Sequence, residues 1–274
     1  MKVLITGALG HLGGSLIGLA PANWQIEPFQ RGSQLSTPHE YDLVVHCAAV
    51  HPRAATRPTL EAYLTSNVGL VQKIAEGTMA KSCRLIFIST SYLNAPALLG
   101  PAHNDFSLYS VSKAMAEVYL KTVAPSFHGV YVLRLPVLLS SGPQENSFLQ
   151  ATWQAISASE PVALYNAEAP FPVTDAEEVM ALIHCLAQKG PQGFHVLPGG
   201  ACDTLRLEEI VELFREGFAA KADPLRMIAR QGVTLPTNPL LAEIGFAAST
   251  SFEIISRFMR KEIGTNNVTK QLAS

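Results

Sequence analysis

Short apolar runs alternate with helix-length segments along most of the chain. The runs have the length of buried strands, and the segments between them are long enough to form helices. Strands and helices that alternate in this way predict a parallel sheet covered by helices. The expected strands are Lys2–Thr6, Gln25–Gln30, Asp42–Ala48, Arg84–Ser89, Gly129–Leu135 and Phe194–Leu197.

Several of the longer segments carry signals that begin helices. Pro58 suits a first helical turn. Asp175 and Thr250 are N-cap residues, and each is followed three positions later by a glutamate, Glu178 or Glu253, that can complete a capping box. The expected helices are His11–Ala20, Pro58–Ala80, Leu108–Val123, Phe148–Ser159, Ala176–Gln188, Leu207–Lys221 and Phe252–Ile263.

Loops rich in proline and glycine multiply after Ser140, and the strand–helix rhythm weakens there. This change predicts a second lobe that is interleaved with the main domain. The expected parts are a main domain at residues 1–139 and 170–198, a second lobe at 140–169 and 199–264, and a loose polar tail at 265–274.

Composition excludes several classes of protein. Of the 274 residues, 48% are hydrophobic and 15% charged, so the chain can bury a sizeable core. A net charge of −2 and the absence of a basic cluster argue against a nucleic-acid-binding protein. The cysteines Cys47, Cys83, Cys185 and Cys202 show neither a disulfide framework nor metal-ligand spacing, which favours a reducing cytoplasm and no metal site.

The N-terminal stretch MKVLITGALGHLGGSLIGLAPA has some features of a secretory signal, but glycines and Thr6 interrupt its apolar run. No run approaches the ~18 apolar residues of a membrane span. We therefore expect neither a signal peptide nor contact with a membrane.

The stretch VLITGALGHLGGSL places Gly7, Gly10 and Gly13 directly after the first strand and at the opening of a helix. In a dinucleotide-binding turn the first glycine permits a tight turn, the second lets backbone approach the pyrophosphate, and the third lets helix and strand pack closely. The N–H groups at the helix start, at His11 and Leu12, would then receive the phosphates. The sequence thus predicts a dinucleotide site in the main domain.

The stretch LYSVSKAM places Tyr109 and Lys113 four positions apart, on one face of an expected helix. An ammonium beside a phenol favours the phenolate and lowers the pKa of the tyrosine from about 10. Such a tyrosine can exchange a proton with a substrate oxygen near neutral pH. By itself this spacing is weak evidence for a reactive pair, and it becomes informative only together with the other motifs of the chain.

Together, the glycine loop and the Tyr-x-x-x-Lys pair about a hundred residues later resemble the extended short-chain dehydrogenase/reductase family. Further segments resemble that family in order and spacing over nearly the whole chain. They are VVHCAAV (44–50), SNVGL (66–70) with a structural Asn67, IFISTS (86–91), LRLPVLL (133–139), PFPVTDAEEVM (170–180), GFHVLPGG (193–200) and LLAEIGFAASTSFEIISRF (240–258).

The resemblance implies an α/β fold, a Rossmann-type doubly wound parallel sheet with a small C-terminal substrate lobe. It also implies that Tyr109 is the general acid/base and that Lys113 lowers its pKa and binds the nicotinamide ribose. Thr90 would hydrogen-bond the substrate carbonyl, with Ser91 as the second choice. The residues implied at the cofactor are Gly7, Gly10, His11, Leu12, Gly13, Arg31, Ala48, Ala49, Tyr109, Lys113 and Pro136.

The segment GSQLSTPHEY (32–41) departs from the family pattern because it is too short for the helix and strand that usually lie there. The sheet is therefore expected to be one strand narrower on that side, and adenine recognition is left open. Gln30-Arg31 stands at the end of the second strand, while Glu27 comes too early to bind a ribose 2′-hydroxyl. These positions favour NADP, with NAD as the alternative.

The residues after Thr90 bear on the reaction. Sugar 4,6-dehydratases of this family follow their threonine with Asp-Glu, whereas this chain has Ser91-Tyr92, which argues against dehydration. Reduction of a ketone on a nucleotide-sugar or similar metabolite, or C4 epimerisation through a transient ketone, remains. The pattern is nearest to the 4-keto-sugar reductases. A non-catalytic NADP-binding regulator or scaffold is the alternative from another class.

Other residues receive structural interpretations. His46 and His51 are expected to have a packing or loop role rather than a catalytic one, and Arg226 and Arg230 to be solvated rather than to grip a substrate diphosphate. The resemblance also implies a homodimer in which the helices at 58–80 and 108–123 pair. Their apolar residues are Leu60, Tyr63, Leu64, Val68, Val71, Ile74, Val111, Met115, Val118 and Tyr119.

Overall fold

The computed structural model describes most of the chain. Of residues 104–107 and 265–272 it describes the backbone alone. The described residues are 1–30, 32–35, 40–52, 58–94, 104–140, 148–164, 166–220 and 230–272.

The chain forms two compact units, which are considered separately. The first consists of Met1–Leu135, Met180–Gly199 and Glu243–Gly245, and the second of Pro136–Val179, Gly200–Ala242 and Phe246–Ser274.

A parallel sheet of six strands forms the centre of the first unit, in the order β2-β1-β3-β4-β5-β9. The fold is thus the predicted Rossmann-type α/β fold, and the expected strands are confirmed within two residues at each end. The strands are β1 (Lys2–Thr6), β2 (Gln25–Phe29), β3 (Leu43–His46), β4 (Arg84–Thr90), β5 (Gly129–Leu135) and β9 (Gly193–Pro198).

Strand β2 is an edge strand of this sheet, as the short 32–41 segment predicts. It carries Pro28, which lacks the N–H that a strand with two neighbours would use, so its edge position fits its sequence. Among the described residues no further strand pairs with β2, in keeping with the expectation of a sheet that is one strand narrower on this side.

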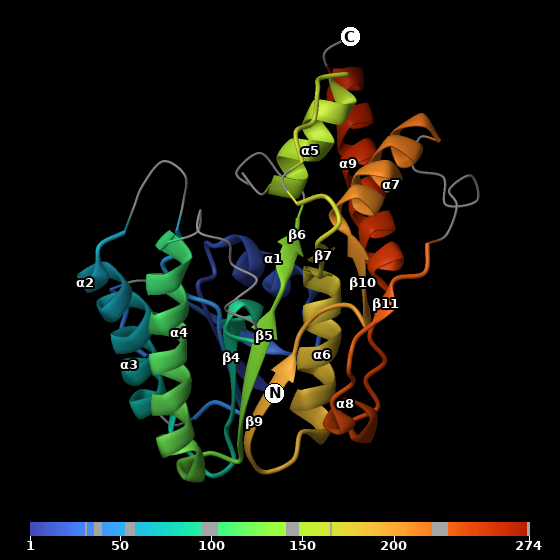
Figure 1. The fold of residues 1–274 in the computed structure, drawn as a ribbon. Helices are drawn as coiled ribbons and strands as arrows, with labels where there is room; N and C mark the ends of the chain where they lie inside the picture. Colours follow the sequence, from blue (N-terminus) through green and yellow to red (C-terminus); the bar gives the residue numbers. More distant parts are fainter. Residues whose placement is uncertain are drawn as a thin grey trace. The chain divides into compact units, whose positions relative to one another are not determined.

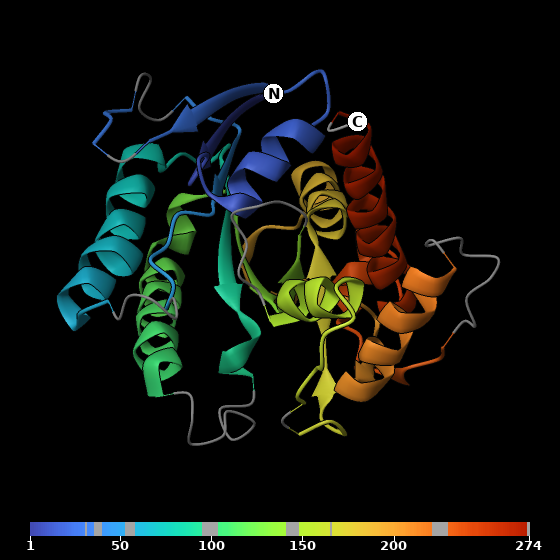
Figure 2. The same ribbon diagram turned by 90° about the horizontal axis from the view of Figure 1, so that it is seen from above.

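Helices cover both faces of the sheet (Figures 1 and 2). Helices α3 and α4 pack on one face and bury a core of Leu, Val and Phe side chains that includes Val44, Phe87 and Val132. Helix α1 lies on the other face (Figure 2). The helices of this unit are α1 (His11–Leu19), α2 (Leu60–Tyr63), α3 (Leu70–Thr78), α4 (Asn104–Val123) and the later part of α6 (Ala176–Lys189).

The single helix expected at Pro58–Ala80 is instead interrupted by a π-helical segment, η1 (Leu64–Gly69). Such wide turns occur frequently at functional sites. Residues of this segment face inward, because Ser66 and Asn67 are both buried. The periodicity of the sequence did not reveal this change, since apolar residues continue at helical spacing through it.

The second unit contains two small sheets and a separate aromatic core. Strands of two to four residues were not predicted, because runs this short carry no periodicity. Trp153 packs edge-on against Phe214 and Phe258 at the centre of this unit. Its elements are β6 (Val137–Leu139), β7 (Pro170–Phe171), β8 (Val173–Asp175), β10 (Asp203–Arg206), β11 (Val233–Thr234), α5 (Phe148–Ser157), α7 (Leu207–Ala219), α8 (Pro239–Glu243) and α9 (Ser251–Leu272).

Helix α9 continues to Leu272, so the expectation of a loose tail from residue 265 is wrong for the described backbone. The polar residues there lack the apolar stripe that predicts a helix, and the helix is propagated from the amphipathic turns before them. No helix within the described parts of the chain is both long and apolar enough to span a membrane.

Candidate functional site

The turn between β1 and α1 is built around glycine. Gly7 has φ +71°, and a Cβ there would lie 2.8 Å from the backbone nitrogen of Ala48. A Cβ on Gly13 would lie 2.3 Å from the carbonyl oxygen of Gly7. Both positions thus accept only glycine without a backbone shift, which is what the predicted turn and close helix–strand packing require.

Helix α1 begins at His11 without a side-chain cap, because its N-cap residue is Gly10. The N–H of Gly10 bonds to the carbonyl of Gly7 at 2.8 Å, while the N–H groups of the first helical turn have no intrahelical acceptor. A helix start of this kind binds phosphate oxygens. The residues therefore fit the pyrophosphate of a dinucleotide, with His11 and Leu12 supplying the first helical N–H groups.

The ends of β1 and β3 are joined beside this turn. The hydroxyl of Thr6 accepts a hydrogen bond from the N–H of Ala48 at 3.2 Å and shares another with Nδ1 of His46 at 3.0 Å. Burial, with a smaller contribution from Lys113, lowers the pKa of His46 to about 3. The imidazole is therefore neutral at physiological pH, and its packing role is in keeping with the sequence interpretation. Ala48 is half-buried and Ala49 exposed at the same edge of the sheet.

Asn67 links the loop after β3 to α4. Its side-chain amide accepts from the N–H of Val50 at 2.7 Å and donates to the carbonyl of Val50 at 3.0 Å. It also donates to Oγ of Ser112, whose hydroxyl donates to the carbonyl of Tyr109. The π-helical turn thus presents one buried asparagine that fixes both the loop and the first part of α4.

Tyr109 lies in an aromatic surrounding and is 7% exposed. Its ring centroid is 4.8 Å from that of His51 and 6.3 Å from that of Tyr63. Burial, followed by the neighbouring phenols of Tyr92 and Tyr63, raises the pKa of Tyr109. The phenol is therefore protonated at neutral pH and is a proton donor in this state.

Lys113 is 1% exposed and lies one turn along α4 from Tyr109. Its Nζ donates to the carbonyl oxygen of Ile88 at 2.7 Å and lies 4.6 Å from the ring centroid of Phe87 and 5.9 Å from that of Tyr109. Burial lowers the pKa of Lys113 to about 8, against the opposite effects of Cys47 and Glu117.

The expectation that Lys113 lowers the pKa of Tyr109 is not met in this structure. The ammonium points to a strand carbonyl rather than to the phenol oxygen, so the cost of burying a phenolate outweighs the attraction of the nearby charge. The spacing in the sequence placed both side chains on one helix face, but it does not set their exposure.

Thr90 ends β4 and is 5% exposed. Its hydroxyl accepts from the N–H of Tyr92 at 3.3 Å, which closes the short 3₁₀ turn η2 (Ser91–Leu93). A hydroxyl that accepts from one N–H can still donate its own proton. Ser91, the first residue of this turn, is half-buried.

A polar network built on the buried Glu117, next to these residues, was not predicted. Glu117 accepts from the hydroxyl of Ser89 at 2.5 Å and forms a forked ion pair with Arg134, at 3.2 Å from Nε and 2.7 Å from Nη2. Arg134 also donates to the side-chain oxygen of Asn94 at 2.8 Å. The available signal was the position of Glu117, four residues after Lys113 and hence on the same face of α4.

Other predicted residues lie elsewhere. Arg31 and Arg226 fall outside the described residues. Pro136 is the first residue of the second unit, where it packs closely on Gly200. Arg230 is not solvated as expected, because it is paired with Glu212 at 3.1 Å and Glu216 at 2.7 Å.

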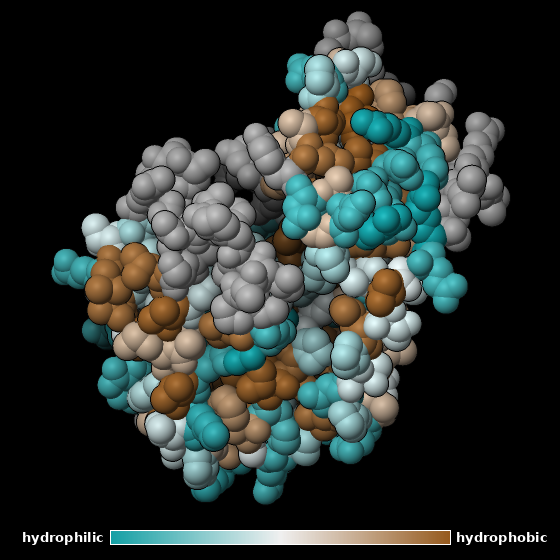
Figure 3. Space-filling model, viewed as in Figure 1, coloured by the Kyte–Doolittle hydropathy of each residue, from teal (hydrophilic) through white to brown (hydrophobic). Residues whose placement is uncertain are grey.

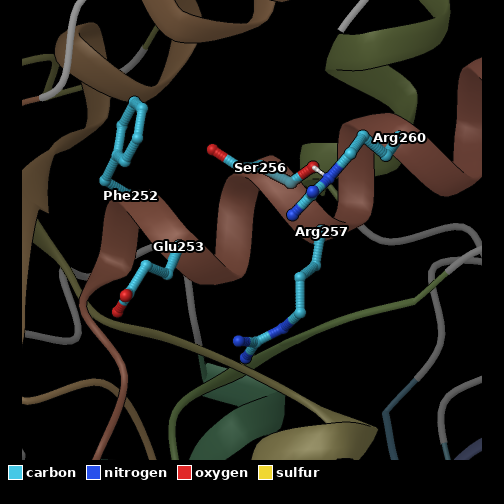
Figure 4. A pocket seen from close by; sticks show the side chains of 5 residues that line it. All are labelled: Phe252, Glu253, Ser256, Arg257 and Arg260. Carbon is cyan, nitrogen blue, oxygen red and sulfur yellow. Dashed lines mark hydrogen bonds between the residues drawn. The ribbon is translucent and has the colours of Figure 1, made fainter. Parts of the chain in front are cut away.

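A pocket of about 290 Å³ lies against α9 in the second unit and is lined in part by Phe252, Arg257 and Arg260 (Figure 4). Arg257 donates two hydrogen bonds to Asp175 and one to Glu178, which holds the start of α6 against α9. Because these bonds occupy its guanidinium, the cluster is structural.

The capping predictions in this unit are confirmed in part. Asp175 accepts from the N–H of Glu178 at 2.8 Å and is an N-cap, but the carboxylate of Glu178 bonds to Ser249 and Arg257. Thr250 and Glu253 form the complete capping box.

The family model described as NAD dependent epimerase/dehydratase family matches residues 30–197, which is more than half of the chain. No curated protein matches the chain. The fold and the matched region together define an NAD-dependent enzyme class. The chain belongs to the NAD dependent epimerase/dehydratase family.

Solved structures with the same fold are distant in sequence. The enzyme WbmF of Bordetella bronchiseptica, in complex with NADH, has a TM-score of 0.73 at 16% identity over 99% of this chain and 94% of its own. The UDP-glucuronic acid 4-epimerase of Bacillus cereus, in a Tyr-to-Phe variant with a fluorinated UDP-sugar and NAD, has a TM-score of 0.74 at 15% identity over 97% and 100%. RMD of Pseudomonas aeruginosa, complexed with NADPH, has a TM-score of 0.70 at 17% identity over 96% and 99%.

Proposed function

We propose that this enzyme transfers hydride between NADP(H) and a carbonyl or alcohol carbon of a nucleotide-linked sugar or similar metabolite, with Tyr109 as the general acid/base. The observation that carries the proposal is the position of Tyr109 and Lys113. Both are buried on one face of α4, and Lys113 is bonded to the strand that ends in Thr90. A carbonyl reduction requires a proton donor of this kind next to a hydroxyl donor.

The cofactor would be held by the glycine turn and the start of α1, with Ala48 and Ala49 lining its site and Lys113 at the ribose. When bound, its nicotinamide supplies or accepts the hydride. NADP is favoured by the presence of Arg31 shortly after the second strand in the sequence, with NAD as the alternative. Relatives are complexed with NAD, NADH or NADPH, so both choices occur in this fold.

The roles of the chain's own groups follow from their positions. In the reducing direction the phenol of Tyr109 gives its proton to the substrate oxygen as the carbon–oxygen double bond becomes a single bond. The hydroxyl of Thr90, already accepting from Tyr92, donates a hydrogen bond to the same oxygen and stabilises its developing charge. Ser91 is the alternative donor. In the oxidising direction it is the phenolate of Tyr109, left after proton transfer, that takes the proton back as base.

Two reactions fit this arrangement. Reduction of a ketone is the first choice, because Ser91-Tyr92 follows Thr90 in place of the Asp-Glu of the dehydratases. Epimerisation through a transient ketone is the second, and the fold of the Bacillus cereus 4-epimerase gives it some support. A non-catalytic regulator is disfavoured because it has no need of Tyr109, Lys113 and Thr90 together.

The experiment that separates these functions uses a panel of nucleotide-linked sugars. Oxidation of NADPH or NADH on adding a keto-sugar indicates a reductase. Inversion at C4 without net oxidation of added cofactor indicates an epimerase. Cofactor binding without turnover of any member of the panel would leave the regulator as the better account.

A second copy of the chain is the proposed partner. Hydrophobic surface lies over α2 and α4 (Figure 3). On α4, the exposed side chains of Val111, Met115 and Val118 follow helical spacing. Of the residues expected at this interface, however, Tyr63, Val71 and Ile74 are buried, and Val71 and Ile74 belong to the core between the helices and the sheet. The proposed interface therefore uses the outer stripe of α4 together with Leu60.

A further inference from the structure

The buried carboxylate of Glu117 is connected to both parts of the proposed catalytic site. On its own helix it lies one turn after Lys113 and two turns after Tyr109. Through Arg134 and Asn94 it reaches the turn after Thr90. This turn is closed by the bond from the N–H of Asn94 to the carbonyl of Ser91 at 2.8 Å.

The geometry of this connection is specific. The fork of Arg134 places Nε and Nη2 on the two oxygens of Glu117 and leaves Nη1 for Asn94 at 2.8 Å. Ser89 supplies a further hydrogen bond, so each partner of the pair is tied to β4 or to the turn that follows it. A planar, forked guanidinium sets direction as well as distance, which lysine cannot do.

A partly buried ion pair of this kind need not stabilise the folded protein. The side chains of Glu117 and Arg134 are 8% and 23% exposed, and the cost of removing such charges from water commonly offsets their attraction. Apolar side chains of similar volume would hold α4 on the sheet at least as well. The presence of this pair is therefore better explained by the way it positions α4 and the turn after β4 than by a gain in folding stability.

We propose that Glu117 and Arg134 form a positioning pair that sets Tyr109 and Lys113 in register with the turn carrying Thr90 and Ser91. The inference rests on the proposed function, because it assigns these residues a role in that same reaction. Neither residue touches substrate. They act by fixing two elements whose hydroxyl groups must reach one substrate oxygen.

The carboxylate of Glu117 has an electrostatic effect as well. The groups around the ammonium of Lys113 are the neutral His46 on β3, the thiol of Cys47 after it, the carbonyl of Ile88, and Tyr109 and Glu117 on α4. Among these described groups Glu117 carries a negative charge, and it favours the protonated lysine. Neutralising it should lower the pKa of Lys113 further below about 8.

The test compares two variants of this network with the unaltered enzyme on a substrate found in the panel. Glu117→Gln keeps the shape but removes the charge, and Asn94→Ala removes the bond to the turn. Both should reduce kcat by about 10- to 100-fold with little change in KM, since a misplacement near 1 Å costs this much. The alkaline limb of the pH–rate profile should move to lower pH in Glu117→Gln and stay in place in Asn94→Ala.

Arg257→Met is the matched control. It breaks an ion pair of similar exposure, 21% and 5%, in the second unit and should lower thermal stability while kcat stays the same below its unfolding temperature. If Glu117→Gln does not fold, Asn94→Ala still decides, because its bond can be removed without burying a charge.

Tyr109→Phe, measured in parallel, separates failure of the proposed function from failure of the proposed positioning role. If Tyr109→Phe retains activity, the proposed function fails and the inference fails with it. If Tyr109→Phe is inactive while Glu117→Gln and Asn94→Ala keep the kcat and pH profile of the unaltered enzyme, the positioning role alone is wrong. A loss of kcat in both variants that is shared by Arg257→Met would also overturn it, since instability would then explain the effect.

Discussion

The ammonium of Lys113 and the carbonyl of Ile88 are joined by a hydrogen bond of 2.7 Å, which ties α4 to β4 next to the strand's last residues. The bond satisfies a charge that is 1% exposed. It also explains why burial, rather than a lysine partner, dominates the pKa of Tyr109. The two elements that carry the proposed catalytic groups are therefore held together at this point and again at Glu117 and Arg134.

The glycine turn can be tested with two substitutions in one helix. Gly13→Ala should weaken cofactor binding severely, because its Cβ would lie 2.3 Å from the carbonyl oxygen of Gly7 and would force the turn open. Gly18→Ala is the control, since no atom lies within 4 Å of its Cβ. It should leave binding unchanged and raise the free energy of unfolding by about 0.5–1 kcal/mol. Fluorescence titration and thermal unfolding measure these effects, and equal binding by both variants would contradict the assignment.

The buried histidine predicts a dependence of stability on pH. Because the pKa of His46 is lowered from 6.5 to about 3, the unfolded chain takes up a proton in this range that the folded chain does not. The contribution of His46 to the free energy of unfolding is thus present above about pH 6.5 and is lost as the pH falls toward 3. In urea unfolding experiments, the free energy of unfolding should fall less steeply with decreasing pH in His46→Gln than in the unaltered protein. Parallel curves for the two proteins would refute the prediction.

The proposed dimer can be tested on the exposed face of α4. Val118 is 67% exposed, and Val118→Glu should place a charge within an apolar interface and yield a monomer. Val233→Glu is the control, because Val233 is 73% exposed in the second unit and should leave the mass unchanged. Light scattering at micromolar concentration reports the mass. A monomeric mass for the unaltered chain would rule out the interface.

Cofactor choice can be tested at Arg31. The unaltered enzyme should bind NADPH more tightly than NADH, because the guanidinium can pair with the 2′-phosphate. Arg31→Ala should remove most of this preference by weakening NADPH binding while NADH binding is retained. Equal affinities for the two cofactors in the unaltered enzyme, measured by fluorescence titration, would contradict the NADP assignment.

Much of the first unit could be predicted from its sequence, because its strands are apolar runs of ordinary length and its glycine turn has a backbone requirement that residue types reveal. The order of motifs then placed Tyr109, Lys113 and Thr90 on particular elements. A change of helical period leaves no mark in the spacing of apolar residues. The spacing at 58–80 therefore predicts continuous helix through the π-helical turn at Asn67.

The other features that the sequence did not predict are the contacts and exposure of side chains rather than their positions on helices and strands. Spacing put Tyr109 beside Lys113, but exposure and the direction of the ammonium depend on β4, which lies far away in sequence. The bond from Arg134 to Glu117 likewise joins a strand to a helix. The short strands of the second unit have too few residues for a pattern, and α9 extends past the last apolar residue that indicates it.

The most direct test of the account is the turnover of Tyr109→Phe. The change removes one hydroxyl from a packed ring, so the fold and cofactor binding should be nearly intact. Because the proton donor is lost, kcat should fall by ~10²–10⁴-fold on a substrate identified for the unaltered enzyme. Unchanged cofactor affinity and unfolding temperature in the same preparation would show that the lower kcat reflects the chemical step rather than binding or folding. Full activity of Tyr109→Phe on that substrate would contradict the proposed mechanism.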